Sequence, residues 1–343
     1  MTQEHSTETS SLATIVMVPR ERFSTTKRSL ASLYQHTRPP FDLIYVDGGS
    51  PRHIAHHLAA EARLRGFRLI QKPHYLPPHH ARNLAAALAS TRYVVFVDND
   101  VIFSPGWLET LVECAEATGA DAVTPLICMN EPIHTTIHVA GGVARISEQN
   151  GQRRFEEVMR FYGLPLQKVR GQLKREPTGL IEFHCVLIRR SVFERFGPFD
   201  ESYLASSEHL DFCLSINQRP GSIFFEPRSI ITYLAPPPIT LGDLPYFTLR
   251  WSDEWTVASE RYFYRKWNAE FTDRIVRFAV DHRRWGLRRL RRVMLAIVGW
   301  RRSQWLSDWL DAMLIAIAKR RGARKISKTQ WDDSVTASSR PPQ

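Results

Sequence analysis

Residues 93–100 read Tyr-Val-Val-Phe-Val-Asp-Asn-Asp, an apolar run of β-branched and aromatic residues that ends in two carboxylates one residue apart. A short continuous apolar run is typical of a strand buried on both faces, as in a parallel sheet. The carboxyl ends of such strands form the edge at which open α/β sheets bind ligands. The run therefore predicts a parallel sheet with Asp98 and Asp100 at its ligand-binding edge.

Asp98 and Asp100 also predict a cation site at this edge. Carboxylates this close together repel each other and are costly to desolvate unless a cation or a donor-rich ligand lies between them. Their oxygens suit Mg²⁺ or Mn²⁺, particularly when phosphates complete the coordination shell. The alternative interpretation of the same residues is a solvated turn after a strand.

Apolar segments alternate with amphipathic ones on both sides of this run, from Leu12 to about Leu126. The expected strands cover residues 13–18, 41–46, 67–72, 93–97 and 122–124, and the expected helices cover residues 25–36, 53–65, 79–89 and 105–117. The last helix should have Ser104 as its N-cap and Pro105 in its first turn. The alternation predicts an α/β fold with a mostly parallel sheet and flanking helices.

The pattern divides the chain into four segments. Residues 127–177 are less regular and are expected to form an insertion over the sheet edge, before regular structure returns with strands at 181–188, 222–225 and 230–233 and helices at 191–196 and 208–217. The run Pro236-Pro237-Pro238 then ends the sheet domain. We predict a disordered tail at 1–11, a sheet domain at 12–238, a basic and aromatic-rich helical region at 239–327, and a disordered tail at 328–343.

Composition limits the class of protein. The chain has 343 residues of which 43% are hydrophobic, enough for one large core with an appended segment. Its four cysteines show no metal-binding spacing, which indicates reduced thiols and no zinc site. The polar start shows no signal peptide, and no apolar run reaches the ~18 residues that span a bilayer. These features predict a cytoplasmic protein.

Short motifs follow the expected strands and helices in a fixed order. They are Val18-Pro19-Arg20, Val46-Asp47-Gly48-Gly49-Ser50, His80-Ala81-Arg82-Asn83, Asp98-Asn99-Asp100, Leu187-Ile188-Arg189-Arg190 and Phe196-Gly197-Pro198-Phe199-Asp200-Glu201. Their order and spacing between about Thr14 and Leu234 resemble those of the inverting, GT-A-fold glycosyltransferases of family 2. The resemblance implies a transferase that takes a sugar from a nucleotide diphosphate donor, with Mn²⁺ or Mg²⁺, and attaches it to an acceptor hydroxyl.

The resemblance also implies a set of residues that face the donor: Pro19, Arg20, Asp47, Arg82, Asp98 and Asn99. Asp47 would lie against the nucleotide base, because the glycines after it let the backbone come close while its carboxylate accepts N–H groups. Arg82 is near a helix N-terminus, where a guanidinium and free N–H groups attract a diphosphate. Asp98 would contact the ribose or the metal, and Asp100 would coordinate the metal. An ordinary Asp-Gly turn and a surface arginine are the alternatives.

The catalytic base is less constrained. The family usually carries Glu-Asp at the start of a late helix, whereas residues 207–211 here read Ser-Glu-His-Leu-Asp. Glu208 and Asp211 are three apart, so we expect both on the helix face that looks into the cleft, where either would deprotonate the acceptor. His209 has the position of the family's usual base and is an alternative base or metal ligand.

A second departure concerns the metal site. Tyr233 stands where the family often supplies a histidine, and tyrosine is an unfavourable ligand for Mg²⁺ or Mn²⁺. Either Asp100 holds the metal with diphosphate and water, or His184 or His209 substitutes for the missing ligand. An ordinary buried histidine is the alternative for His184.

The region from 283 to 325 gathers arginine and lysine and carries only Asp308 and Asp311 as acids, in a chain of net charge +11. Apolar stretches at 293–300 and 305–318 carry tryptophan and have arginine or lysine beside them, which is typical of helices in a membrane interface. We predict peripheral attachment to the inner face of the cell membrane and a glycan or lipid-linked acceptor. Packing against the sheet domain or a homodimer interface is the alternative; nucleic acid is not expected, since no motif for it is present.

Two other functions compete with sugar transfer. A nucleotidyltransferase of the same fold would have an Arg- and Gly-rich phosphate loop after the first strand, but residues 18–23 contain no glycine. A catalytically silent nucleotide-sugar-binding module would also explain the altered residues at His209 and Tyr233. Donor hydrolysis in the presence of Mn²⁺ would discriminate between the transferase and the silent module.

Overall fold

The computed structural model describes residues 11–217, 222–235, 238–286 and 300–321. The strands are β1 (Ala13–Val18), β2 (Asp42–Gly48), β3 (Arg68–Lys72), β4 (Tyr93–Asp98), β5 (Val101–Phe103), β6 (Ala122–Met129), β7 (Thr136–Val139), β8 (Gly142–Gln149), β9 (Gln152–Met159), β10 (Glu176–Pro177), β11 (Cys185–Arg189) and β12 (Ile223–Tyr233). The helices are α1 (Thr26–His36), α2 (Arg52–Arg65), α3 (Pro78–Ala86), α4 (Trp107–Thr118), α5 (Leu166–Val169), α6 (Ser191–Phe196), α7 (Glu208–Ile216), α8 (Leu244–Arg250), α9 (Asp253–Lys266), α10 (Arg274–Gly286) and α12 (Trp300–Arg321). Residues 1–10 of the N-terminal tail predicted at 1–11, the tail predicted at 328–343, and residues 293–299 lie outside the described residues.

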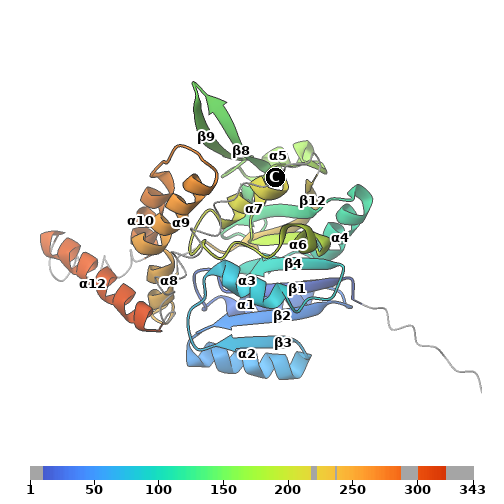
Figure 1. The fold of residues 1–343 in the computed structure, drawn as a ribbon. Helices are drawn as coiled ribbons and strands as arrows, with labels where there is room; N and C mark the ends of the chain where they lie inside the picture. The colour runs from blue at the N-terminus through green and yellow to red at the C-terminus, as the bar shows by residue number, and fades with distance from the viewer. Residues whose placement is uncertain (1–10, 218–221, 236–237, 287–299, 322–343) are drawn as a thin grey trace, which may run out of the picture.

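A single large sheet organises the molecule. Its strand order is β10-β12-β6-β11-β4-β1-β2-β3, with β5 paired to β12 and β7 to β6. The pairs β4–β1, β1–β2, β2–β3 and β6–β12 are parallel, whereas β11 runs antiparallel between β4 and β6. Helices flank this sheet, as Figure 1 shows. The predicted α/β fold with a mostly parallel sheet is confirmed.

Strand β4, which carries the apolar run before the two carboxylates, lies at the centre of the fold. All six of its residues are buried, because β1 and β11 pair with its two edges and hydrophobic side chains cover both its faces. The parallel strands β1, β2 and β4 end side by side, so Asp47 and Asp98 reach the same edge of the sheet from strands on either side of β1. This arrangement places the predicted donor residues near one another.

Several expected boundaries were wrong. Helix α4 begins at Trp107, after Gly106 in a left-handed conformation (φ 75°), so Ser104 and Pro105 form the preceding turn instead of its cap and first turn. The strands expected at 222–225 and 230–233 are one strand, β12, whose register against β6 shifts between Glu226 and Ile230. Residues 181–184 precede β11 instead of forming part of it.

The insertion at 127–177 contains regular structure that the sequence pattern did not reveal. It supplies the end of β6, β7, the hairpin β8–β9, α5 and β10. The hairpin forms its own two-stranded sheet and stands out from the main sheet at the top of Figure 1. Ion pairs fix the hairpin to the C-terminal region, with Arg154 Nε 3.0 Å from Glu270 Oε2 and Arg274 Nη2 3.3 Å from Glu157 Oε2.

The C-terminal helices α8 and α9 pack into the same core as the sheet. Tyr246, Leu249, Trp255 and Phe263 are buried in the main hydrophobic cluster. Asp243, just before α8, accepts hydrogen bonds from the backbone N–H groups that follow β1, at residues 23 and 24 (2.7 and 3.0 Å). The helices therefore hold the loop after β1 in place at the ligand-binding edge.

Helix α12 lies farthest from the sheet, beside α8 (Figure 1). Its Leu310 and Leu314 pack against Leu244 of α8, whereas Trp305 and Trp309 are 67% and 53% exposed. Packing against α8, within the C-terminal helical region, thus accounts for one side of this helix. Among the described residues, no helix combines the length and the hydrophobicity that crossing a bilayer requires.

Candidate functional site

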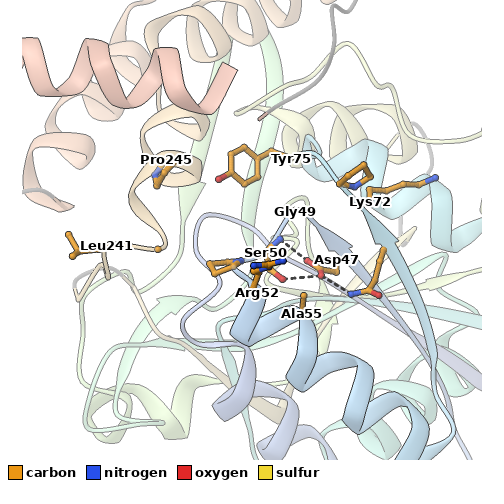
Figure 2. A pocket seen from close by; sticks show the side chains of 13 residues that line it. Asp47, Gly49, Ser50, Arg52, Ala55, Lys72, Tyr75, Leu241 and Pro245 are labelled. Atoms are coloured by element: carbon orange, nitrogen blue, oxygen red, sulfur yellow. Dashed lines mark hydrogen bonds between the residues drawn. The ribbon is translucent and has the colours of Figure 1, made fainter. Parts of the chain in front are cut away.

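A cavity of about 680 Å³ opens at the carboxyl ends of β2 and β3. Three segments line it: residues 47–55 after β2, residues 71–75 at the end of β3, and residues 241–245 before α8. Figure 2 shows Asp47 and Ser50 on its floor, with Leu241 and Pro245 to one side and Lys72 to the other. The C-terminal region therefore completes a cavity that begins on the sheet.

Asp47 is fixed on the floor of this cavity. One carboxylate oxygen accepts from the Ser50 backbone N–H at 3.1 Å, and the other accepts from the Ser50 hydroxyl at 2.9 Å and from Gln71 Nε2 at 3.4 Å. Burial raises the pKa of Asp47 above its ordinary value. Gly49 has φ +73°, and a Cβ there would lie 3.0 Å from the His74 carbonyl carbon, so only glycine fits this close approach.

Asp98, Asp100 and His184 form a compact group of ligand atoms at the end of β4. One ligand atom from each residue lies within 4.8 Å of the other two, and all three residues are buried. His184 comes from the turn into β11, and its Nδ1 is 3.2 Å from Asp98 Oδ2. Of the interpretations of His184 that the sequence left open, this geometry favours the substitute metal ligand.

The side chain of Asp100 is the clearest sign of a cation site. Both of its oxygens are buried and have no hydrogen-bond partner among the described residues. Burial raises the pKa of Asp100 to about 8, because the nearby Arg22 offsets only part of the cost of desolvating its charge. Two carboxylates with one imidazole form a donor set that fits Mn²⁺ or Mg²⁺. The residues present therefore fit the predicted metal.

Tyr233 does not belong to this donor set. Its hydroxyl donates to Glu21 Oε1, and its ring stacks on that of His184 with centroids 3.9 Å apart. Burial, followed by the nearby charge of Glu21, raises the pKa of Tyr233 well above its ordinary value. The neutral tyrosine thus packs against His184.

The side chains of Arg82 and Asn99 bind other residues of the protein. The Arg82 guanidinium donates to Asp98 Oδ1 at 3.1 Å and lies 3.9 Å from Glu208 Oε1, and it lines neither this cavity nor the one described below. The Asn99 amide donates to the Arg22 carbonyl (2.8 Å) and to the Thr26 hydroxyl (2.9 Å). Arg82 orients Asp98 and Asn99 shapes the loop after β1; direct contact of either with the donor stays a prediction.

Pro19 and Arg20 lie in that loop. Pro19 is buried and its carbonyl accepts from the Tyr246 hydroxyl at 3.3 Å. The Arg20 side chain is 18% exposed, its Nε lies 3.9 Å from Asp98 Oδ2, and its Nη1 lies 3.0 Å from His184 Nδ1. Arg20 therefore lies beside Asp98 and His184 and also lines a cavity.

Arg20 lines a second cavity, of about 570 Å³. The first turn of α7 lines it with Glu208 and His209, and Glu182 joins them from the segment before β11. Asp211 lines a different, smaller cavity and is bound to Tyr203, Lys266 and Trp267 at 2.8–3.0 Å. The expectation that Glu208 and Asp211 face one cleft was wrong, because α9 packs against the Asp211 side of α7.

Glu208 and His209 have opposite electrostatic surroundings. Burial opposes ionisation of Glu208, but Arg250 (3.5 Å) and Arg82 lower its pKa to about 2. Burial likewise disfavours the charged imidazole of His209, but Glu182 and Glu157 outweigh it and raise its pKa to about 9. His209 Nε2 lies 3.3 Å from Glu182 and 3.7 Å from Glu157. Glu208 is thus a weak base, and His209 a strong one.

Sequence reasoning did not identify Glu157 and Arg250 as site residues. Glu157 comes from the β8–β9 hairpin, and Arg250 ends α8, so both reach the site through tertiary packing alone. A carboxylate in an irregular insertion and an arginine in an arginine-rich region carry no local signal.

Comparison with known proteins agrees with the predicted resemblance. Residues 14–197 match the sequence model of the family described as "Glycosyl transferase family 2". A "Pre-mycofactocin glycosyltransferase" of Mycobacterium tuberculosis is 24% identical over 220 residues, which is 64% of this chain and 42% of the relative. "Succinoglycan biosynthesis protein ExoW" of Rhizobium meliloti is 28% identical over 192 residues, 54% of this chain and 57% of the relative. The chain thus spans about half the length of these relatives.

A solved structure supports the fold. The crystal structure of GalNAc-T7 with UDP, GalNAc and Mn²⁺ is similar to this one with a TM-score of 0.53 at 17% identity, over 84% of this chain and 58% of that one. At this identity the likeness concerns the fold, and it confirms the predicted GT-A architecture.

Proposed function

This chain belongs to glycosyl transferase family 2, and from that premise we propose that it is a metal-dependent, inverting transferase. It moves a sugar from a nucleotide diphosphate donor to the hydroxyl of a glycan or lipid-linked acceptor. The observation that carries the proposal is the buried carboxylate of Asp100, without a partner among the described residues, beside Asp98 and His184. Two further observations support it: the similar GalNAc-T7 structure contains UDP and Mn²⁺, and the Rhizobium relative is named for succinoglycan biosynthesis.

The donor would extend along the carboxyl edge of the sheet. Asp47 would accept N–H groups of the nucleotide base in the 680 Å³ cavity. Asp98 and Asp100 lie beyond β1, about 10 Å away at the usual spacing of strands, and with His184 they would hold the metal. A divalent ion bound there would neutralise the charge that develops on the diphosphate as it leaves. Arg20, beside His184, would add a second positive charge at the same place.

The acceptor would bind in the 570 Å³ cavity, next to Arg20. Its hydroxyl oxygen attacks the anomeric carbon and forms the glycosidic bond, while the bond from that carbon to the phosphate oxygen breaks and the nucleoside diphosphate leaves with the electron pair. The hydroxyl proton must pass to a base of the protein. Of the three predicted bases we propose His209, because Glu208 is held between two guanidinium groups and Asp211 faces another cavity.

Asp47→Asn tests the donor site. The variant should weaken the binding of nucleoside diphosphates about tenfold, because a charged acceptor is replaced by a neutral one in a buried position, a loss of about 1.4 kcal/mol. Isothermal titration of UDP, GDP, ADP, CDP and dTDP with and without Mn²⁺ measures this. Asp42→Asn, at the exposed opposite end of β2, is the matched control and should bind like the parent protein.

The donor proposal fails if none of these diphosphates binds to the parent protein when Mn²⁺ is present. Hydrolysis of the matching nucleotide sugars then separates two functions: turnover supports a transferase, and tight binding without turnover supports a silent binding module.

We also propose that α12 brings the enzyme to an anionic membrane surface at the inner face of the cell membrane. Trp305 and Trp309 lie on the side of α12 that does not pack against α8, and Lys319 and Arg320 are exposed near its end. Aromatic and cationic side chains together are typical of interfacial helices.

Co-sedimentation with liposomes tests this attachment. The protein should sediment with vesicles that contain phosphatidylserine and less with neutral vesicles, and added salt should weaken the binding by screening. The double variant Trp305→Ala, Trp309→Ala should bind less, whereas Leu88→Ala, at an exposed leucine after α3, should not change binding. Equal sedimentation of parent and double variant would exclude this role for α12.

A further inference from the structure

The second cavity has a polar end and an apolar end. Most of its ionisable side chains gather where α7, the segment before β11 and the loop after β1 meet: Glu208, His209, Glu182 and Arg20. Glu157 of β9 joins this end beside His209 (3.7 Å), and Arg274 of α10 pairs with Glu157 at 3.3 Å. The rest of the wall that β9 and α10 form is apolar and is lined by Val158, Met159, Ile275 and Phe278. Apolar atoms make up most of the lining as a whole. Beyond its ionisable end, the cavity therefore offers an occupant a mainly apolar surface.

This division constrains what lies beyond the reacting hydroxyl. A fully hydroxylated sugar needs hydrogen-bond partners around its whole ring, and an unpaired hydroxyl that loses its water costs about 1–3 kcal/mol. The side chains of Ile275, Phe278 and Val158 offer no such partner. Covering an apolar group with such a wall makes the free energy of binding more favourable, by about 25 cal/mol per Å² of apolar surface removed from water.

The apolar wall is held in place by several contacts of α10. His282 Nε2 is 3.1 Å from Glu21 Oε2, and Arg283 Nη1 donates to the Trp251 carbonyl at 2.6 Å. The Phe278 ring lies against those of Trp251 and His282, with centroids 5.8 and 5.4 Å apart. A pocket formed before the ligand arrives binds it without the cost of ordering a loop.

We propose that the acceptor carries an apolar group, aryl or alkyl, directly attached to the sugar or other polar unit that bears the reacting hydroxyl. The hydroxyl would lie at the polar end, beside His209, and the apolar group would lie against α10 and β9. The inference rests on the proposed function and specifies its acceptor. The volume of about 570 Å³ has room for a monosaccharide with such a group.

Paired acceptors test this proposal. Each common hexose is offered as its methyl glycoside and as its p-nitrophenyl and octyl glycosides. The donor is the nucleotide sugar that the hydrolysis assay described above identifies. At least one aryl or alkyl glycoside should be a substrate, with kcat/KM at least about tenfold above that of its methyl counterpart; tenfold corresponds to about 1.4 kcal/mol. Both anomers of each sugar are included, so that the anomeric configuration does not decide the result.

Two variants then test whether the lining of the cavity causes the preference for apolar glycosides. Phe278→Ala should lower the ratio of kcat/KM between apolar and methyl glycosides at least about fivefold. Phe271→Ala is the matched control, because Phe271 is exposed to a similar extent just before α10 but does not line the cavity. Because both phenylalanines are about half exposed, both variants should fold, and thermal unfolding curves check this.

The outcomes separate this inference from the proposed function. If no nucleotide sugar is hydrolysed or transferred by the parent protein, the proposed function is wrong, and this inference falls with it. If donor hydrolysis occurs but no apolar glycoside is preferred over its methyl counterpart, the acceptor class proposed here is wrong while the transferase stands. The same holds if the ratio of kcat/KM between apolar and methyl glycosides is equal in Phe278→Ala and Phe271→Ala.

Discussion

Asp100→Asn should lower both sugar transfer and donor hydrolysis about 10³-fold. A ligand to a catalytic metal supports several kcal/mol of charge stabilisation in the transition state, and about 4 kcal/mol corresponds to 10³ in rate. The loss should come without unfolding, because the variant replaces a buried carboxyl group that has no hydrogen-bond partner among the described residues, and whose ionisation burial opposes, with a neutral side chain of the same shape. Initial rates with Mn²⁺ at saturating donor measure the effect.

Binding data distinguish a metal ligand from a structural residue. Mn²⁺ should raise the melting temperature of the parent protein further when a nucleoside diphosphate is present, since each ligand stabilises the state that it binds. In Asp100→Asn this Mn²⁺-dependent increment should disappear, while the melting temperature without ligands stays equal or rises. Asp42→Asn should behave like the parent protein in both assays. Unchanged turnover in Asp100→Asn would rule out the proposed metal site.

Local sequence was sufficient to predict the carboxylates at the strand ends of the sheet. Asp98 and Asp100 follow an apolar run directly, so the strand and its carboxylates are encoded in eight consecutive residues. Asp47 likewise ends a strand and precedes two glycines. Parallel strands then bring these ends together by a general rule of sheet topology, which needs no knowledge of particular side-chain contacts.

The rest of the site depends on contacts that no local pattern encodes. His184 reaches Asp98 because β11 inserts antiparallel between β4 and β6. Glu157 reaches His209 from a hairpin in the insertion, and Arg250 reaches Glu208 from α8. Helical spacing alone placed Glu208 and Asp211 on one face, but it could not show that Lys266 and Trp267, at the end of α9, would bind Asp211.

His209→Gln should lower the rate of transfer about 10²- to 10⁴-fold, the usual contribution of a general base. The imidazole can accept a proton only when it is neutral. Because its pKa is about 9, set by Glu182 and Glu157 against the effect of burial, kcat/KM should rise about tenfold per pH unit below 9 and level off above it. Initial rates between pH 6 and about 10 on the parent protein and the variant measure this.

Glu182→Gln tests whether His209 is the group whose deprotonation sets the pH profile. Removing one of the two carboxylates beside Nε2 should lower the pKa of His209 and move the rise in kcat/KM to lower pH, whereas a purely structural role for Glu182 would lower the rate without moving the profile. Two positive side chains also lie near the histidine: Arg20 lines the same cavity, and Arg274 pairs with Glu157. Their charges disfavour the imidazolium and so also act to lower the pKa of His209. Asp211→Asn should leave the midpoint of the profile in place, because its carboxylate faces another cavity.

If the profile stays flat between pH 7 and about 9, or if His209→Gln retains the rate of the parent protein, the proton goes elsewhere and His209 is not the base.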